Sequence, residues 1–157
     1  MLAILKEKKI PFLYLCLILI IGLSITGCKK KTEEVYVANI FEQYFEQNIL
    51  NNDFIVSYSK NQGIENTSEF EGYKFRLLKN TYYDGPMTAT KNGITYSGTW
   101  SSNGDYGKLI INITQPTIPS EFIFLNKSWR FTEKALPTMK LAPWGSTDST
   151  ELHMQRQ

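Results

Sequence analysis

The stretch KNGITYSGTW, residues 91–100, decides the fold class. Its Asn92-Gly93 pair supplies two consecutive residues that tolerate positive φ, as a type I′ β-hairpin turn requires. After the turn, apolar and polar residues alternate, with Ile94, Tyr96, Gly98 and Trp100 in one set and Thr95, Ser97 and Thr99 in the other. Such alternation places one face of a strand on a core and the other in water. The stretch therefore predicts the second strand of an antiparallel hairpin.

The same two-residue period recurs before and after this hairpin. The alternating apolar sets are Phe54/Val56/Tyr58, Tyr73/Phe75/Leu77, Leu109/Ile111/Ile113, Phe122/Phe124, Trp129/Phe131, Met139/Leu141 and Leu152/Met154. Turn-forming residues separate them, among them Asp84-Gly85-Pro86 and Asn103-Gly104-Asp105. About eight strands with short turns and no second helix predict a mainly β fold, an antiparallel up-and-down meander that closes into a barrel. An open sheet curled around a helix is the alternative.

One amphipathic helix is predicted ahead of the strands, over residues 35–50. Its expected buried face carries Val37, Ile40, Phe41, Tyr44, Phe45 and Ile49, and its polar face Glu42, Gln43, Glu46 and Gln47. These positions follow the helical period. Thr32 is the expected N-cap. We expect this helix to plug or cover the core.

The start of the chain is typical of a secretory signal. Basic residues precede an apolar run over residues 10–25, which is shorter than the roughly 20 residues of a membrane-spanning helix. Ile25, Thr26, Gly27 and Cys28 then resemble the bacterial lipobox, with Ile25 in place of the usual leucine. The resemblance implies that residues 1–27 are removed and that Cys28 carries acyl chains such as palmitate. Two or three such chains anchor a protein firmly in a membrane.

Residues 28–35 are expected to form the lipidated cysteine and a charged tether, followed by a single domain over residues 36–157. Lys29 is not the aspartate that retains lipoproteins in the inner membrane of enteric bacteria, so the outer membrane is expected. The tether also resembles the surface-export tethers of lipoproteins in the Bacteroidetes. The sequence leaves open whether the protein faces the periplasm or the cell surface.

Charge and cysteine content narrow the function classes. Of 17 basic and 15 acidic residues, three lysines and one glutamate lie in the signal, leaving 14 of each. A neutral domain has no basic stripe for nucleic acid. Cys16 lies in the signal and Cys28 is the lipidation site, so no disulfide or metal-binding thiolate is expected. With a single histidine, His153, a zinc site is not expected either.

Several short motifs together resemble the small lipocalin-like lipoproteins of Flavobacterium and its relatives. A first strand motif is matched by Thr67, Phe70, Gly72, Tyr73 and Phe75, and two later ones by Gly98-Thr99-Trp100 and by Leu125-Asn126 with Trp129. Phe54 stands where that family usually has a tryptophan. The resemblance covers most of residues 36–155. It implies a lipocalin-like barrel, mostly of unassigned function, and carries over no catalytic residue.

The remaining candidate site residues are aromatic or acidic. Phe75, Tyr96, Trp100 and Trp129 either fill the core or line a barrel mouth that binds a small apolar ligand. Trp144, in a Pro-Trp-Gly turn, is expected to be an exposed contact residue. His153 is expected to be an exposed strand residue rather than a general base. Loop carboxylates are the only candidates for a hydrolase, namely Asp84, Asp105 and Glu121.

Three functional hypotheses follow. The first is a lipid-anchored, non-catalytic envelope protein whose barrel binds a small apolar ligand or another envelope protein. The second is a structural or accessory subunit of an envelope complex, with a filled barrel whose outer face docks a partner. The third is a hydrolase that uses loop carboxylates. Neither of the first two hypotheses requires a cofactor or a metal, and neither involves nucleic acid.

Overall fold

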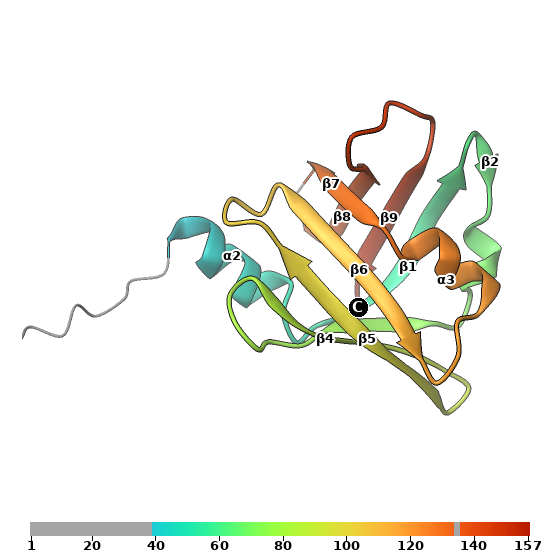
Figure 1. Cartoon of the computed structure of the whole chain (residues 1–157), viewed down its shortest axis with the longest axis horizontal. Helices are drawn as coiled ribbons and strands as arrows, with labels where there is room; N and C mark the ends of the chain where they lie inside the picture. The colour runs from blue at the N-terminus through green and yellow to red at the C-terminus, as the bar shows by residue number, and fades with distance from the viewer. Residues whose placement is uncertain (1–38, 134–135) are drawn as a thin grey trace, which may run out of the picture. The chain divides into compact units, whose positions relative to one another are not determined.

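The computed structural model describes residues 39–133 and 136–157, which fold as one helix followed by a β-barrel (Figure 1). The strands are β1 (Asp53–Asn61), β2 (Ile64–Glu65), β3 (Lys74–Leu77), β4 (Asp84–Lys91), β5 (Ile94–Ser102), β6 (Lys108–Gln115), β7 (Ser128–Glu133), β8 (Thr138–Pro143) and β9 (Glu151–Arg156). The helices are α2 (Ile40–Asn48), the short 3₁₀ helix η2 (Thr67–Phe70) and α3 (Ser120–Leu125).

The barrel is antiparallel and closed. Strands β3 to β9 follow one another in space as they do in sequence, and β1 pairs with β3 on one side and with β9 on the other. The closing pair β1–β9 joins Phe54 to Arg156 at one end and Lys60 to Glu151 at the other. The predicted eight-stranded meander barrel is therefore confirmed, and the open-sheet alternative is excluded. One further strand, β2, was not predicted and extends the edge of β1.

The hairpin predicted around Asn92-Gly93 forms as expected. Asn92 and Gly93 have φ of 53° and 78°, and β4 pairs with β5 from Lys91↔Ile94 to Asp84↔Ser101. The predicted turn at residues 84–86 is wrong, because these residues begin β4. Gly85 is needed there for space: a Cβ at this position would lie 1.9 Å from the Leu78 carbonyl oxygen.

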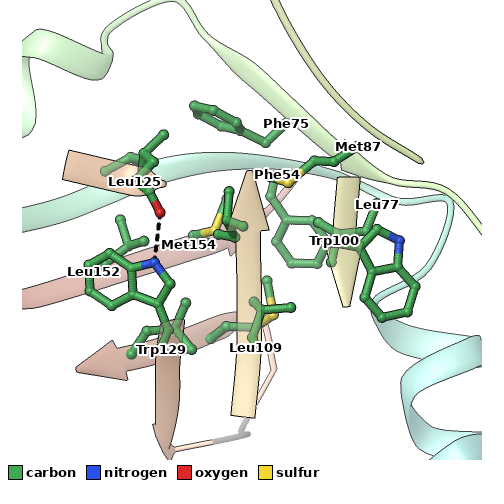
Figure 2. Packing of buried hydrophobic residues seen from close by; sticks show 14 of the residues in the cluster. Phe54, Phe75, Leu77, Met87, Trp100, Leu109, Leu125, Trp129, Leu152 and Met154 are labelled. Carbon is green, nitrogen blue, oxygen red and sulfur yellow. Dashed lines mark hydrogen bonds between the residues drawn. The ribbon is translucent and has the colours of Figure 1, made fainter. Parts of the chain in front are cut away.

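Side chains fill the barrel interior (Figure 2). Phe54, Phe75, Leu77, Met87, Leu109, Leu152 and Met154 have no exposed surface. The two interior tryptophans also satisfy their indole N–H groups, since Trp100 Nε1 donates to Leu78 O at 2.7 Å and Trp129 Nε1 to Leu125 O at 2.9 Å. An eight-stranded barrel is just wide enough to be filled in this way.

A helix closes each end of the barrel (Figure 1). At one end α2 inserts Phe45, whose ring stacks 4.5 Å from that of Tyr106 and lies 5.4 Å from that of Trp100. At the other end α3 buries Phe122, whose ring lies 5.1 Å from that of Tyr96. The strand predicted at Phe122 and Phe124 is wrong, and so is the expectation of no second helix.

The faces of α2 differ from those predicted. Asn39 is the N-cap, and a capping box joins it to Glu42, which is fully buried. Ile40 and Phe41, assigned to the buried face, are 76% and 50% exposed. Phe45 and Ile49 are buried as expected, so the true buried face is rotated from the predicted one. Thr32, the predicted N-cap, lies outside the described residues.

The structure also corrects the motif carried over from the resemblance. Thr67 and Phe70 belong to η2 rather than to a strand, and Gly72 follows in a turn with φ of 81°. Only Phe75 of that motif lies in β3. Within the described residues, none of the helices has the length and apolar character needed to cross a membrane.

Phe45 provides a test of how α2 closes the barrel. Phe45→Ala should lower the free energy of unfolding by about 3–5 kcal/mol, because it removes a buried ring from a packed site. Phe41→Ala, on the same helix at a half-exposed position, should lower it by less than about 1 kcal/mol. Urea denaturation followed by circular dichroism measures both. Equal losses in the two variants would show that Phe45 does not anchor the helix.

Candidate functional site

The predicted ligand aromatics lie in the core or at its edge. Phe75 and Trp129 have no exposed surface and Trp100 has 1%. Tyr96 is half-buried, with its ring 6.0 Å from that of Tyr73. The structure thus brings Phe75 and Tyr96 to the α3 end, where Phe122 contacts both rings. Phe75, Tyr96 and Trp129 pack against protein, whereas Trp100, although only 1% exposed, also lines an open space of about 410 Å³ together with Asp84 and Gly85.

The side chains beneath α2 are packed equally tightly. A crevice lined by Phe45, Ile49, Tyr106, Phe131 and Met139 encloses only about 10 Å³. This volume is at or below what a single water molecule needs. Glu42 is buried beside it and accepts a hydrogen bond from the Tyr83 hydroxyl. The α2 end is therefore a packed lid and offers no room for a ligand.

The predicted acidic candidates have local partners. Asp84 accepts hydrogen bonds from Asn80 Nδ2 and Thr81 Oγ1, at 3.1 and 3.0 Å. Asp105 accepts one from the Gly107 backbone N–H at 2.8 Å. Glu121, on α3 at the other end of the barrel, accepts one from the Tyr73 hydroxyl at 2.7 Å. Glu121 therefore does not share a cleft with the other two.

Tyr73 is held in its neutral form. Burial, together with its hydrogen bond to Glu121, raises the pKa of the Tyr73 phenol well above its ordinary range. A neutral phenol donates the hydrogen bond and does not act as a nucleophile near neutral pH. Among the described residues, no group of three or more histidine, cysteine, aspartate and glutamate side chains is placed to hold a metal ion.

His153 is half-buried rather than exposed as predicted. It lies on β9 with its ring 5.0 Å from that of Tyr58, and its Nε2 is 3.6 Å from Glu151 Oε2. Burial lowers the pKa of the imidazole against the opposing effect of the Glu151 carboxylate. Trp144, by contrast, is 47% exposed as predicted, with the Lys108 ammonium 5.4 Å from its ring centroid.

Open spaces occur on the outside of the barrel, in places that the sequence did not indicate. The larger of two near η2 has a volume of about 610 Å³ and lies between the β1–β2 turn and α3, with Ile64 and Ile123 exposed on its rim. Lys127 also lines it, over the rings of Phe124 and Trp129 at 4.9 and 5.3 Å. Burial lowers the pKa of this ammonium group.

The second space, the β1–β3 groove, has a volume of about 490 Å³. Its walls are Ile55 and Val56 of β1 on one side and Gly72, Tyr73 and Lys74 on the other, with Phe70 of η2 between them. Val56, Phe70 and Tyr73 are core residues that are 8%, 2% and 3% exposed. The groove therefore brings the apolar core close to solvent, and its volume lies in the range of ligand and peptide sites.

Comparison with known proteins identified no relative of this chain. The chain matches no protein-family model, and no curated protein or solved structure is significantly similar to it.

The single histidine offers a direct check on the packing of β1 against β9. NMR titration should give His153 a pKa below its ordinary value of 6.5, because burial disfavours the imidazolium. The neutral ring then contributes fully to stability above the unfolded-state pKa, and this contribution falls as the pH drops below it. His153→Gln should flatten the pH dependence of unfolding between about pH 7 and 5. A measured pKa above 6.5 would show instead that Glu151 dominates.

Proposed function

We propose that the chain is a lipid-anchored protein of the bacterial envelope whose packed barrel holds another envelope protein on its outer surface, without catalysing a reaction. The observation that carries this proposal is the filled interior, where Phe54, Phe75 and Trp129 leave no exposed surface. A barrel packed in this way acts as a rigid scaffold, and its open spaces lie outside.

Anchoring rests on the sequence alone, since Ile25, Thr26, Gly27 and Cys28 lie outside the described residues. Acyl chains on Cys28 would hold the domain at the outer membrane, with residues 29–38 as the connection to the N-cap Asn39. No cofactor enters this function. Nucleic acid is not a proposed partner, because the charge of the domain is balanced.

A small apolar ligand is the second candidate function. It is favoured by the β1–β3 groove, whose volume of about 490 Å³ would suit a small molecule. Two glutamates, Glu65 and Glu71, line the same groove, however. Because a purely apolar molecule gains nothing from those charges, the protein partner remains the leading proposal.

Substitution of Cys28 tests whether the protein is lipidated. Cys28→Ser should leave an unlipidated precursor that keeps residues 1–27 and no longer incorporates labelled palmitate, because acyl transfer and cleavage both require the thiol. Mass spectrometry and detergent partitioning of the wild-type and variant proteins measure this. Cys16→Ser is the matched control and should mature normally. A Cys28 variant of mature mass that still partitions into detergent would contradict the anchor.

Native mass spectrometry of the wild-type protein, extracted from its own membrane in mild detergent, separates the two candidate functions. A bound polypeptide mass is the expected result. A bound small-molecule mass would favour the ligand hypothesis instead. Release of only the bare protein under conditions that keep other envelope complexes intact would contradict both.

A further inference from the structure

The wall of the barrel is interrupted next to β1. Strand β3 pairs with β1 only at Asp53↔Arg76 and Phe54↔Phe75, and β2 joins the same edge only at Lys60↔Glu65 and Asn61↔Ile64. Between these pairs, within the described part of the chain, β1 has a strand neighbour on its β9 side alone.

Helix η2 covers the part of this interruption that lies next to β2. The Ser59 N–H donates to Thr67 Oγ1 at 2.9 Å, and the Ser59 carbonyl accepts from the Asn66 N–H at 3.0 Å. Between these bonds and the β3 pairs, Ile55 and Val56 of β1 line the β1–β3 groove. On that side they face the groove rather than another strand. On the far side, pairing of β3 with β1 ends at Phe75, so Lys74 faces the same groove.

The floor of the groove suits an apolar side chain. Val56, Phe70 and Tyr73 lie there and belong to the main core cluster. A side chain that entered from outside would contact them and remove their remaining exposed surface from water. The groove therefore combines a strand edge with an apolar pocket, and these are the two elements that bind an extended peptide by strand addition.

The rim of the groove is acidic. Glu65 and Glu71 line it, and Glu69 lies between them in a stretch, residues 62–72, that contains no basic residue. Among the described residues, none of these three glutamates forms a salt bridge; the five ion pairs involve other acids. Lys74 is the one basic residue that lines the groove. An occupant with positive charge would complement this rim.

We infer that the β1–β3 groove binds a short, extended, positively charged segment of a partner protein, which adds a strand to the edge of β1 and places an apolar side chain on Phe70 and Val56. This inference rests on the proposed function and specifies its docking site. Cationic side chains of the segment would face Glu65 and Glu71. The volume of about 490 Å³ limits the inserted part to a few residues.

A fluorescent peptide of alternating lysine and valine tests the inference on the full chain kept in detergent. Fluorescence anisotropy should show binding that weakens as salt is added, because exposed charges are screened. Glu65→Gln with Glu71→Gln should weaken binding by roughly tenfold. The matched control, Glu46→Gln with Glu133→Gln, removes the same charge from exposed ion pairs elsewhere and should change binding by less than about twofold.

Two further probes separate strand addition from charge attraction. A peptide of alternating glutamate and valine should not bind, and the lysine–valine peptide with methylated backbone nitrogens should lose binding because it cannot donate hydrogen bonds to β1. Hydrogen exchange should slow at residues 55–56 and 72–74, which line the groove, when the unmodified peptide is bound. Equal binding of either control peptide, or protection confined to other segments, would overturn the inference.

The experiments distinguish failure of the groove inference from failure of the proposed function. If a polypeptide partner co-purifies equally well with wild-type protein and with the Glu65→Gln, Glu71→Gln variant, the groove is not its docking site, although the proposed function stands. If no partner accompanies the wild-type protein but the lysine–valine peptide binds as expected, the site stands and the docking function fails. Circular dichroism of both double variants checks that each remains folded.

Discussion

The pairing of β1 with β9 is the constraint on which the rest of the structure depends. It joins residues about a hundred positions apart, such as Phe54 and Arg156, and it turns a meander into a closed ring. Joining such distant segments carries a large loop-closure entropy. The apolar side chains that offset it, among them Phe54, Met154 and Leu152, lie on the two strands that close. Closing the barrel therefore also brings these core side chains together.

Closing the ring also determines where the surface is open. Because β9 occupies one edge of β1 along most of its length, only the other edge is left for β2 and β3. These two short strands cover its ends and leave the middle to η2 and the β1–β3 groove. The two helices then fill the barrel ends with Phe45 and Phe122. A packed interior and an interrupted wall are thus consequences of the same strand order.

The sequence predicted those features that depend on local pattern. Asn92-Gly93 determines its own turn, and the alternation in β6 and β9 follows from one-sided burial. In β1 the predicted alternation holds only to Val56, because a bulge follows and Ser59 is buried in place of Tyr58. In β5 it is wrong at Ile94, which is 52% exposed. The pattern failed at residues 122–125, because a continuous apolar run has no period that separates strand from helix. It also failed on α2, although the Asn39–Glu42 spacing of a capping box was readable. The predicted helix began too early. Glu42 was also placed on the polar face, although its carboxylate can be buried because it accepts hydrogen bonds from the Asn39 N–H and the Tyr83 hydroxyl.

The candidate site could be predicted less well from the sequence. That Phe75, Trp100 and Trp129 are apolar was readable, but whether they surround a ligand or one another depends on how the strands close. The β1–β3 groove depends on register, since nothing in the alternation of Tyr73, Phe75 and Leu77 says that pairing with β1 ends at Phe75. Long-range pairing of this kind has no local signature in the chain.

The position of α2 between the N-terminal segment and β1 has a mechanical consequence. A pulling force on the N-terminal segment reaches α2 before it reaches any strand of the barrel. It loads first the contacts of Phe45 and Ile49, together with the Glu42–Tyr83 hydrogen bond and the Lys79–Glu46 ion pair. It then loads the backbone bond from Asn51 N to Leu77 O at 2.8 Å. These contacts can yield while β1 stays paired with β9. If the anchor proposed on Cys28 holds the chain, tension on the connection would therefore unpack α2 before it opens the closed barrel.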